Sequence, residues 1–249
     1  MGVDMSSFLG GTHGTCKWQL ENGTLYVTAA DGHSGVLKWP YPWIQYADCI
    51  DRVSIEENVL DEQGQPPFVR DGRVFRPVDL ENLQDIIDKH LHWILQDCEG
   101  WENMRADFSY ANLEGMDLHG AALHAALFKC AYMYRTDLHG ADLRFAVMTF
   151  SCMEQADLQN TDLKYADMHG AYMADALMQH ADLESADIYN AVLTGADLEG
   201  ANLYMAAVED TDVAGANLKN AVLKGTCLED MALEDAKDSH DGFDDHDDR

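Results

Sequence analysis

Apolar residues recur at every fifth position over about half of the chain, from residue 106 to residue 235. Aligned on that position, the segment divides into 26 consecutive five-residue words, and the third residue of every word is Leu, Met, Phe, Ile or Val. The first residue is Ala in 19 words and Thr, Ser or Met in the others. An α-helix repeats its faces about every 3.6 residues and a flat strand every two, so neither keeps a five-residue stripe on one side. The period instead predicts a repeat architecture.

A coil with four sides, and one word on each side, satisfies this period. Residues twenty positions apart then lie above one another, and such residues match, because Leu143, Leu163 and Leu183 form one column while Phe128 and Met148 belong to another. Glycine stands fifth in many words, which suits the corners because glycine accepts positive φ. At a strand-like separation of about 4.8 Å, the words form about 6.5 coils with a length of roughly 30 Å.

Tandem words of the form A(D/N)LxG resemble the pentapeptide-repeat family, and the resemblance covers 130 of the 249 residues. It implies a right-handed four-sided, or quadrilateral, β-helix over residues 106–235. The expected fold class is therefore mainly β. We expect a small N-terminal β domain over residues 1–76, a capping α-helix with its connection over 77–105, the β-helix, and a disordered acidic tail over 236–249.

The N-terminal hundred residues follow a different pattern. The segment "KWQLENGTLYVTAAD" predicts two short strands joined by a hairpin turn at Asn22-Gly23. Residues 14–59 resemble the short β module that precedes leucine-rich repeats in some bacterial surface proteins. The features that carry this resemblance are Trp18, the Asn22-Gly23-Thr24-Leu25 turn, Pro42-Trp43 and the strand over residues 53–59. The resemblance suggests a fold for this domain and assigns it no role.

The segment "PVDLENLQDIIDKHLHWILQDC" predicts an amphipathic helix with Asp79 as its N-cap. Its apolar residues, spaced by three and four, form one stripe: Leu80, Leu83, Ile87, Leu91 and Ile94. Solenoids need capped ends, and this helix ends just before the first word. We therefore expect the stripe to cover the open core around Phe108 and Leu113. The alternative is a helix that packs only on the N-terminal domain.

The net charge and the motifs of the sequence reduce the number of functions that the protein could have. The formal net charge is -29, with -16 in the repeat, so direct nucleic-acid binding is disfavoured. No stretch has the pattern of a signal peptide or a membrane span, which indicates a cytoplasmic protein. The six cysteines include no CxxC pair, which argues against a zinc site or a disulfide scaffold. Motifs of nucleophilic catalysis and phosphate binding are absent, so we expect no enzyme, cofactor or metal.

Histidines offer the nearest approach to a metal site. The four-sided coil places His119 above His139, yet the two would share a metal only with a third ligand, and solvated surface histidines are the simpler interpretation. His90 and His92 lie two apart on the expected helix and so point to different sides. The tail "DSHDGFDDHDDR" has carboxylates for weak cation binding but no calcium-loop spacing.

The second residue of most words is Asp or Asn, but on two neighbouring sides it turns apolar. With nearby aromatic residues these positions predict an outward apolar face: Leu127, Tyr132, Tyr134, Phe145, Val147, Phe150, Cys152, Tyr172 and Val192. A face of this size is normally covered, by the N-terminal domain, by a second copy in a homodimer, or by a foreign protein. The first hypothesis is therefore a non-catalytic scaffold that binds a protein partner or its own copy through this face.

The alternative is a DNA mimic. Some members of the family imitate duplex DNA with an acidic β-helix and bind DNA gyrase, inhibiting it or protecting it from quinolones. In this chain Asp142, Asp162 and Asp182 continue without interruption on one side. However, 11 of the 22 acidic residues in the repeat are the second-place Asp that the family motif supplies in any case. The scaffold is therefore the favoured hypothesis, with gyrase as the alternative partner.

Overall fold

The computed structural model describes residues 9–13, 16–21, 24–30, 35–36, 52–55, 59–60, 69–70, 73–78 and 80–229. The chain divides into two compact units. The first comprises Met1–Asp79 with Tyr110–Asn112, and the second comprises Leu80–Ser109 with Leu113–Arg249. Within the described residues no helix combines the length and apolar character needed to cross a bilayer, and no cysteine there forms a disulfide.

The described strands of the first unit include a four-stranded sheet in the order β1-β2-β3-β5. The strands are β1 (Leu9–His13), β2 (Cys16–Glu21), β3 (Thr24–Ala29) and β5 (Arg52–Ile55). Strands β2 and β3 are antiparallel with Glu21 opposite Thr24, the register that a two-residue hairpin predicts. The turn residues themselves lie outside the described residues. Alternate residues of β3 are buried, namely Leu25, Val27 and Ala29.

Three pairs of two-residue strands complete this unit. β4 (Gly35–Val36) is parallel to β6 (Val59–Leu60), and β7 (Val69–Arg70) is antiparallel to β8 (Arg73–Val74). β9 (Arg76–Pro77) is parallel to β10 (Ala111–Asn112), and among the described strands of this unit only β10 comes from the repeat.

The second unit begins with α1 (Leu80–Leu95) and the 3-10 helix η2 (Trp101–Asn103). The expected apolar stripe of α1 is wrong at Leu91, which is 46% exposed, because the fully buried residue is its neighbour His90. The Nδ1 of His90 accepts the N–H of Ala106 at 3.0 Å, and its Nε2 lies 3.1 Å from the carbonyl oxygen of His124. Two hydrogen bonds to the coil backbone therefore turn the buried face of α1 toward His90. The expected N-cap, Asp79, lies outside the described residues.

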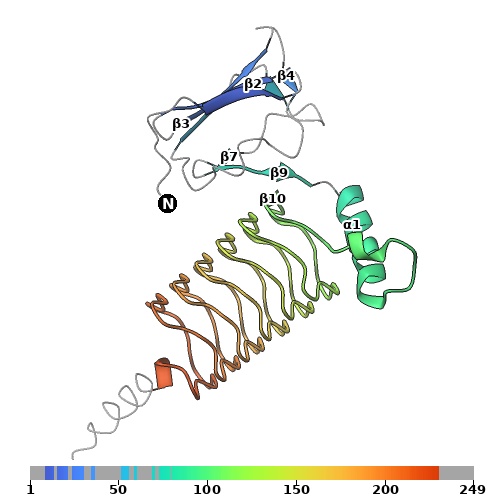
Figure 1. Cartoon of the computed structure of the whole chain (residues 1–249). Helices are drawn as coiled ribbons and strands as arrows, with labels where there is room; N and C mark the ends of the chain where they lie inside the picture. The colour runs from blue at the N-terminus through green and yellow to red at the C-terminus, as the bar shows by residue number, and fades with distance from the viewer. Residues whose placement is uncertain are drawn as a thin grey trace, which may run out of the picture. The chain divides into compact units, whose positions relative to one another are not determined.

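Between residues 106 and 225 the chain winds as a stack of four-sided coils (Figure 1). Parallel bridges join second-place residues twenty positions apart, for example Asp162 to Asp182. The N–H of Leu163 donates to the carbonyl of Asp182 at 2.8 Å, and the N–H of Asp182 donates back to Thr161 at 2.9 Å. A turn closes each corner, as where the N–H of Ala166 donates to the carbonyl of Leu163 at 3.0 Å. Bonds of both kinds recur from word to word, and the bridges join residues twenty positions apart, the period that the sequence predicts.

First-place and third-place residues fill the interior of the coils. The column that contains Leu143, Leu163 and Leu183 is fully buried. Three polar first-place residues, Thr136, Ser151 and Thr161, are buried as well, and backbone carbonyls accept hydrogen bonds from their hydroxyls. The hydroxyl of Thr136 donates to the carbonyl of Leu113 at 2.8 Å, and the hydroxyl of Thr161 donates to Leu138 at 2.9 Å.

Every fifth place from Tyr110 to Gly225 has positive φ, whether or not the residue is glycine. This conformation costs an L-residue about 1 to 2 kcal/mol, so the backbone ladder and the packed interior must impose it. The regular word conformation ends at Gly225, and residues 226–229 instead begin a helical turn. The later residues of the expected repeat and the acidic tail lie outside the described residues.

Candidate functional site

The second-place aspartates have a local structural role. Their Oδ1 atoms accept the backbone N–H two residues later, at 3.0 Å from Asp137 to His139 and at 3.0 Å from Asp187 to Tyr189. A side chain of this kind mimics a backbone turn and fixes the start of each corner. The acidic character of the repeat therefore follows largely from how the coil is built, and by itself it indicates no partner.

Asp142, Asp162 and Asp182 stand in one ladder, as the register predicts. Arg144 donates two hydrogen bonds to Asp142, from Nε at 2.8 Å and from Nη2 at 2.7 Å. Hydrogen bonding from the Arg144 side chain is the main reason why the pKa of Asp142 is lowered. The Nζ of Lys164 lies 3.5 Å from Asp162 and donates to Asp182, which raises the pKa of Lys164. Two cations therefore accompany the three carboxylates, and the ladder is less negative than the Asp pattern suggests.

The expected apolar face is only partly exposed. The prediction was wrong for Tyr132, which is only 1% exposed. Its ring stacks on that of Tyr134, with centroids 6.2 Å apart. Phe145, Phe150 and Tyr172 are exposed. The remaining members are half-buried: Leu127, Tyr134, Val147, Cys152 and Val192.

Several aromatic side chains that are exposed or half-buried lie in two rows, which border the same side of the coil. The first, here called the corner row, comprises His124, Phe145 and Tyr165, and the Phe145 and Tyr165 rings stack with centroids 5.0 Å apart. Both of these residues are 50% exposed. Val147 follows the corner row and Phe150 stands at the next corner, so apolar atoms continue across this side.

The second row, here called the side row, comprises Phe150, His169 and Tyr189. His169 meets Phe150 edge to face at 5.3 Å and stacks on Tyr189 at 5.2 Å. The ring of Phe150 lies over Gly170, where an added Cβ would come within 2.6 Å of it. The sequence prediction missed Tyr165 and Tyr189. The twenty-residue register would have found Tyr165, which lies one coil beyond Phe145.

His119 and His139 stack as the register predicts, with ring centroids 5.1 Å apart. Nδ1 of His139 lies 3.9 Å from an oxygen of Asp157, at a partly exposed position. Across residues 9–229, where the structure describes them, this pair belongs to no group of three possible metal ligands.

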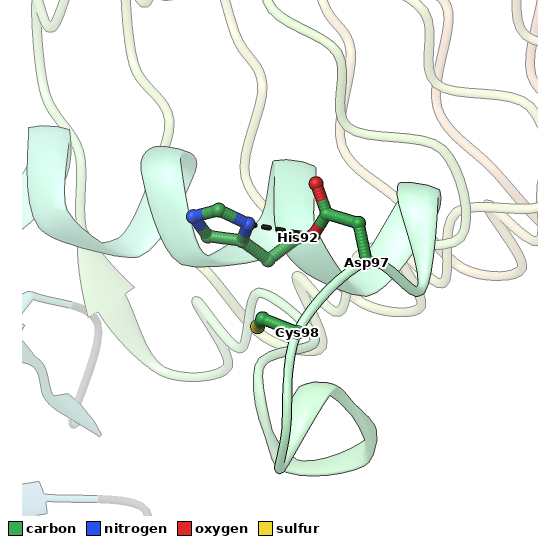
Figure 2. Close-up of side chains that lie close together, drawn as sticks. All are labelled: His92, Asp97 and Cys98. Carbon is green, nitrogen blue, oxygen red and sulfur yellow. Dashed lines mark hydrogen bonds and ion pairs between the residues drawn. The ribbon is translucent and has the colours of Figure 1, made fainter.

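One three-ligand group does occur in the described residues, at the end of α1: His92, Asp97 and Cys98 (Figure 2). Their possible ligand atoms all lie within 4.8 Å of one another, and His92 Nδ1 is 2.7 Å from Asp97 Oδ1. The sequence analysis expected no metal site, and it did not consider these three residues as a group. Their spacing matches no common motif, and only the turn of the chain after the helix brings them together.

A shallow pocket of about 290 Å³ lies between the end of α1 and the first coils. Its lining comprises Trp93, Ile94, Gln96, His124, Asp142 and Arg144. The Nδ1 of His124 is buried there without a hydrogen-bond partner. The two charged groups, Arg144 and Asp142, already satisfy each other, so the pocket offers a ligand little unpaired charge.

A comparison with models of protein families found one match, described as "Pentapeptide repeats (8 copies)". The matched residues are 106–144, 141–179, 166–204 and 176–213. None of the curated proteins compared with the chain matches it. Among solved structures, HetL, a pentapeptide repeat protein involved in heterocyst differentiation regulation in the cyanobacterium Nostoc sp. strain PCC 7120, is 32% identical. That match covers 49% of this chain and 65% of HetL, with a TM-score of 0.31.

Two further structures are similar. Rfr23, a pentapeptide repeat protein from the cyanobacterium Cyanothece 51142, is 31% identical over 43% of this chain and 58% of its own, with a TM-score of 0.17. QnrB1, a plasmid-mediated fluoroquinolone resistance protein, is 17% identical over 49% of this chain and 72% of its own, with a TM-score of 0.35. The chain spans less than two thirds of HetL and of Rfr23. Residues 106–213 therefore match the repeats of the pentapeptide-repeat family, and the fold that this match implies for them is a right-handed quadrilateral β-helix.

Proposed function

We propose that the protein is a non-catalytic scaffold that binds a protein partner through the side of the β-helix between the corner row and the side row. The observation that carries the proposal is the stacked pair Phe145 and Tyr165, each half exposed. Large aromatic side chains grouped on a surface are typical of the centres of protein interfaces. The packed interior does not need them, since Ser185 occupies the same corner one coil later.

Charge favours a foreign partner over a second copy. The chain carries a formal net charge of -29, and two copies repel each other before contact. Acidic second-place residues, Asp167 and Asp187, continue the same side beyond Val147. The partner surface that fits is an apolar patch with basic residues on the edge that meets these carboxylates.

Photo-crosslinking tests this proposal. A photoreactive phenylalanine analogue at Tyr165 should give a covalent adduct with a protein other than the chain itself, and Phe145→Ser should abolish that adduct. The same analogue at Tyr204, an exposed tyrosine of the repeat outside both rows, is the matched control and should give none. Equal adducts from both positions, no adduct from either, or an adduct only with a second copy would contradict the proposal.

We further infer that α1 caps the first of about 6.5 coils. The two hydrogen bonds of His90 to Ala106 and His124 support this role, as does the complete burial of Phe108 and Leu113. Arg105 adds a contact, with its guanidinium 5.6 Å from the centre of the Trp93 ring. A capped end protects the open core of a solenoid from solvent and from pairing with other chains.

A second candidate function, DNA mimicry toward gyrase, draws support from the continuous ladder of Asp142, Asp162 and Asp182. Their pairing with Arg144 and Lys164 counts against it, because a mimic needs carboxylates that face the partner unneutralised. A DNA-supercoiling assay separates the two functions. The scaffold predicts no inhibition of gyrase and no rescue from a quinolone at low micromolar protein and physiological salt. Inhibition that charge reversal of the three aspartates abolishes would establish the mimic instead.

A further inference from the structure

We propose that His92, Asp97 and Cys98 bind one Zn²⁺ ion at the end of α1 (Figure 2). The three side chains offer a nitrogen, an oxygen and a sulfur, the donor set that zinc accepts in proteins. Their ligand atoms lie within 4.8 Å of one another, although Asp97 and Cys98 follow His92 by five and six positions along the chain. This site is separate from the aromatic rows and does not depend on the proposed scaffold function.

The local backbone explains how these residues meet. The N–H of Gln96 donates to the carbonyl of His92 at 2.8 Å and so completes the last helical turn. Gln96 itself has φ 53°, a left-handed conformation that ends helices and reverses the chain. Asp97 and Cys98 therefore come directly after the reversal and face back toward the final turn. Figure 2 shows His92 on the helix, with Asp97 and Cys98 on the segment that leaves it.

Distances in the cluster approach those of a zinc site. Zinc lies about 2.3 Å from thiolate sulfur and about 2.0 to 2.2 Å from imidazole nitrogen or carboxylate oxygen, so donors around a tetrahedral ion stand roughly 3.2 to 3.8 Å apart. The Nδ1 of His92 and the Oδ1 of Asp97 are 2.7 Å apart and already share a hydrogen bond. Zinc would take the place of the proton between them, with small side-chain rotations, and the neutral His92 ring would then carry its proton on Nε2. Binding converts the Cys98 thiol to a thiolate, and its proton passes to solvent.

The donor set also discriminates among metals. Calcium and magnesium prefer oxygen ligands throughout, which this cluster does not supply. The Sγ of Cys98 lies 3.8 Å from the thioether sulfur of Met104, so a softer ion such as Cu⁺ would gain a fourth protein ligand. We assign zinc because imidazole, carboxylate and thiolate all suit it and it does not require the thioether. His92 and Asp97 are exposed, so water completes the coordination.

Zinc titration of the full-length protein by calorimetry tests the site. We expect one Zn²⁺ per chain with a dissociation constant of about 1 μM or below. Cobalt in place of zinc should show the thiolate-to-metal absorption band of a cysteine ligand. Cys98→Ser should remove this band and weaken zinc binding on the order of 100-fold, and Asp97→Asn and His92→Gln should weaken it at least about 10-fold. Asp97→Asn alters an exposed side chain and keeps its shape, so it separates metal binding from folding.

Control variants exclude other sites. His139→Gln and Cys152→Ser change a histidine and a cysteine of the coil and should leave zinc affinity unchanged. Met104→Leu should also leave it unchanged, and a loss as large as that of Cys98→Ser would overturn the zinc assignment in favour of a thioether-binding ion. Zinc binding that survives both His92→Gln and Cys98→Ser would place the ion elsewhere, as in the acidic tail. Either that result or no binding at about 100 μM zinc would overturn the proposal.

Discussion

The inside and the outside of the β-helix use the same twenty-residue register in different ways. Leu143, Leu163 and Leu183 stack inside the coil, and all three are fully buried. At the corner two residues later, the same register stacks Phe145 on Tyr165 in solvent, and the next residue of that column is Ser185. An inward column must therefore keep apolar residues, whereas an outward column need not. Outward aromatic residues that recur in one column are consequently free to take the binding role that we propose for them.

The largest expected effect on stability comes from a substitution in the inward leucine column. Leu163→Ala should lower the free energy of unfolding by about 2 to 5 kcal/mol, because it leaves a cavity between Leu143 and Leu183. Its outward neighbour provides the control, since Lys164→Ala should change that free energy by less than about 0.5 kcal/mol. Urea denaturation followed by circular dichroism measures both. Equal losses at the two positions would mean that the register of the coil is wrong.

A smaller effect is expected at the corner glycines. Gly170 and Gly140 have nearly the same φ, +64° and +65°, but only Gly170 lies beneath the ring of Phe150. Gly140→Ala should cost about 1 kcal/mol of unfolding free energy through backbone strain alone. Gly170→Ala should cost about 2 to 3 kcal/mol, because the side row must also shift. Similar losses for the two variants would show that Phe150 moves aside freely.

The pH dependence of stability tests the junction between α1 and the coil. Burial lowers the pKa of His90 below its usual 6.5, and nearby Arg105 and His124 lower it further, although the hydrogen bond to His124 opposes them. Folding therefore favours the neutral ring, and this contribution is complete above pH 6.5. As the pH falls from 6.5 toward the folded-state pKa, the contribution should be lost at up to about 1.4 kcal/mol per pH unit.

His90→Gln provides the comparison for this effect, because it removes the titrating group. Urea denaturation between pH 7.5 and 5 should show a steeper loss of stability for the natural protein than for the variant. Identical pH profiles would mean that His90 is not held neutral in the folded state.

The sequence predicted the interior of the repeat well because each inward place has only one suitable residue class. Thr136 and Thr161 fitted the same rule as small first-place residues, and the structure supplies partners for their hydroxyls. The corners were predictable where the fifth residue is Gly, Asn or Asp, whereas tertiary packing imposes positive φ on residues such as Phe145 and Tyr165. The intrinsic backbone preference of such a residue does not predict a conformation that tertiary packing imposes on it.

The outside of the molecule was less predictable because it depends on which side chains meet. Tyr132 occupies an outward place and yet is buried, while Tyr165 was overlooked and forms half of the exposed stack. In α1 the period of apolar residues pointed to Leu91, but hydrogen bonds of a polar residue, His90, set the buried face. The His92, Asp97 and Cys98 cluster depends on a single left-handed residue after the helix, which no sequence motif marks.

One measurement tests most directly whether inward residues pack the fold while the outward aromatic residues serve the proposed binding. It compares the free energy of unfolding lost in Tyr165→Ser with that lost in Leu163→Ala. Ser185 already shows that serine fits this corner with φ 57°. Tyr165→Ser should therefore cost less than about 1 kcal/mol, mainly through the lost ring contact with Phe145. A loss as large as that of Leu163→Ala would contradict the account, because the exposed aromatic rows would then stabilise the fold instead of binding a partner.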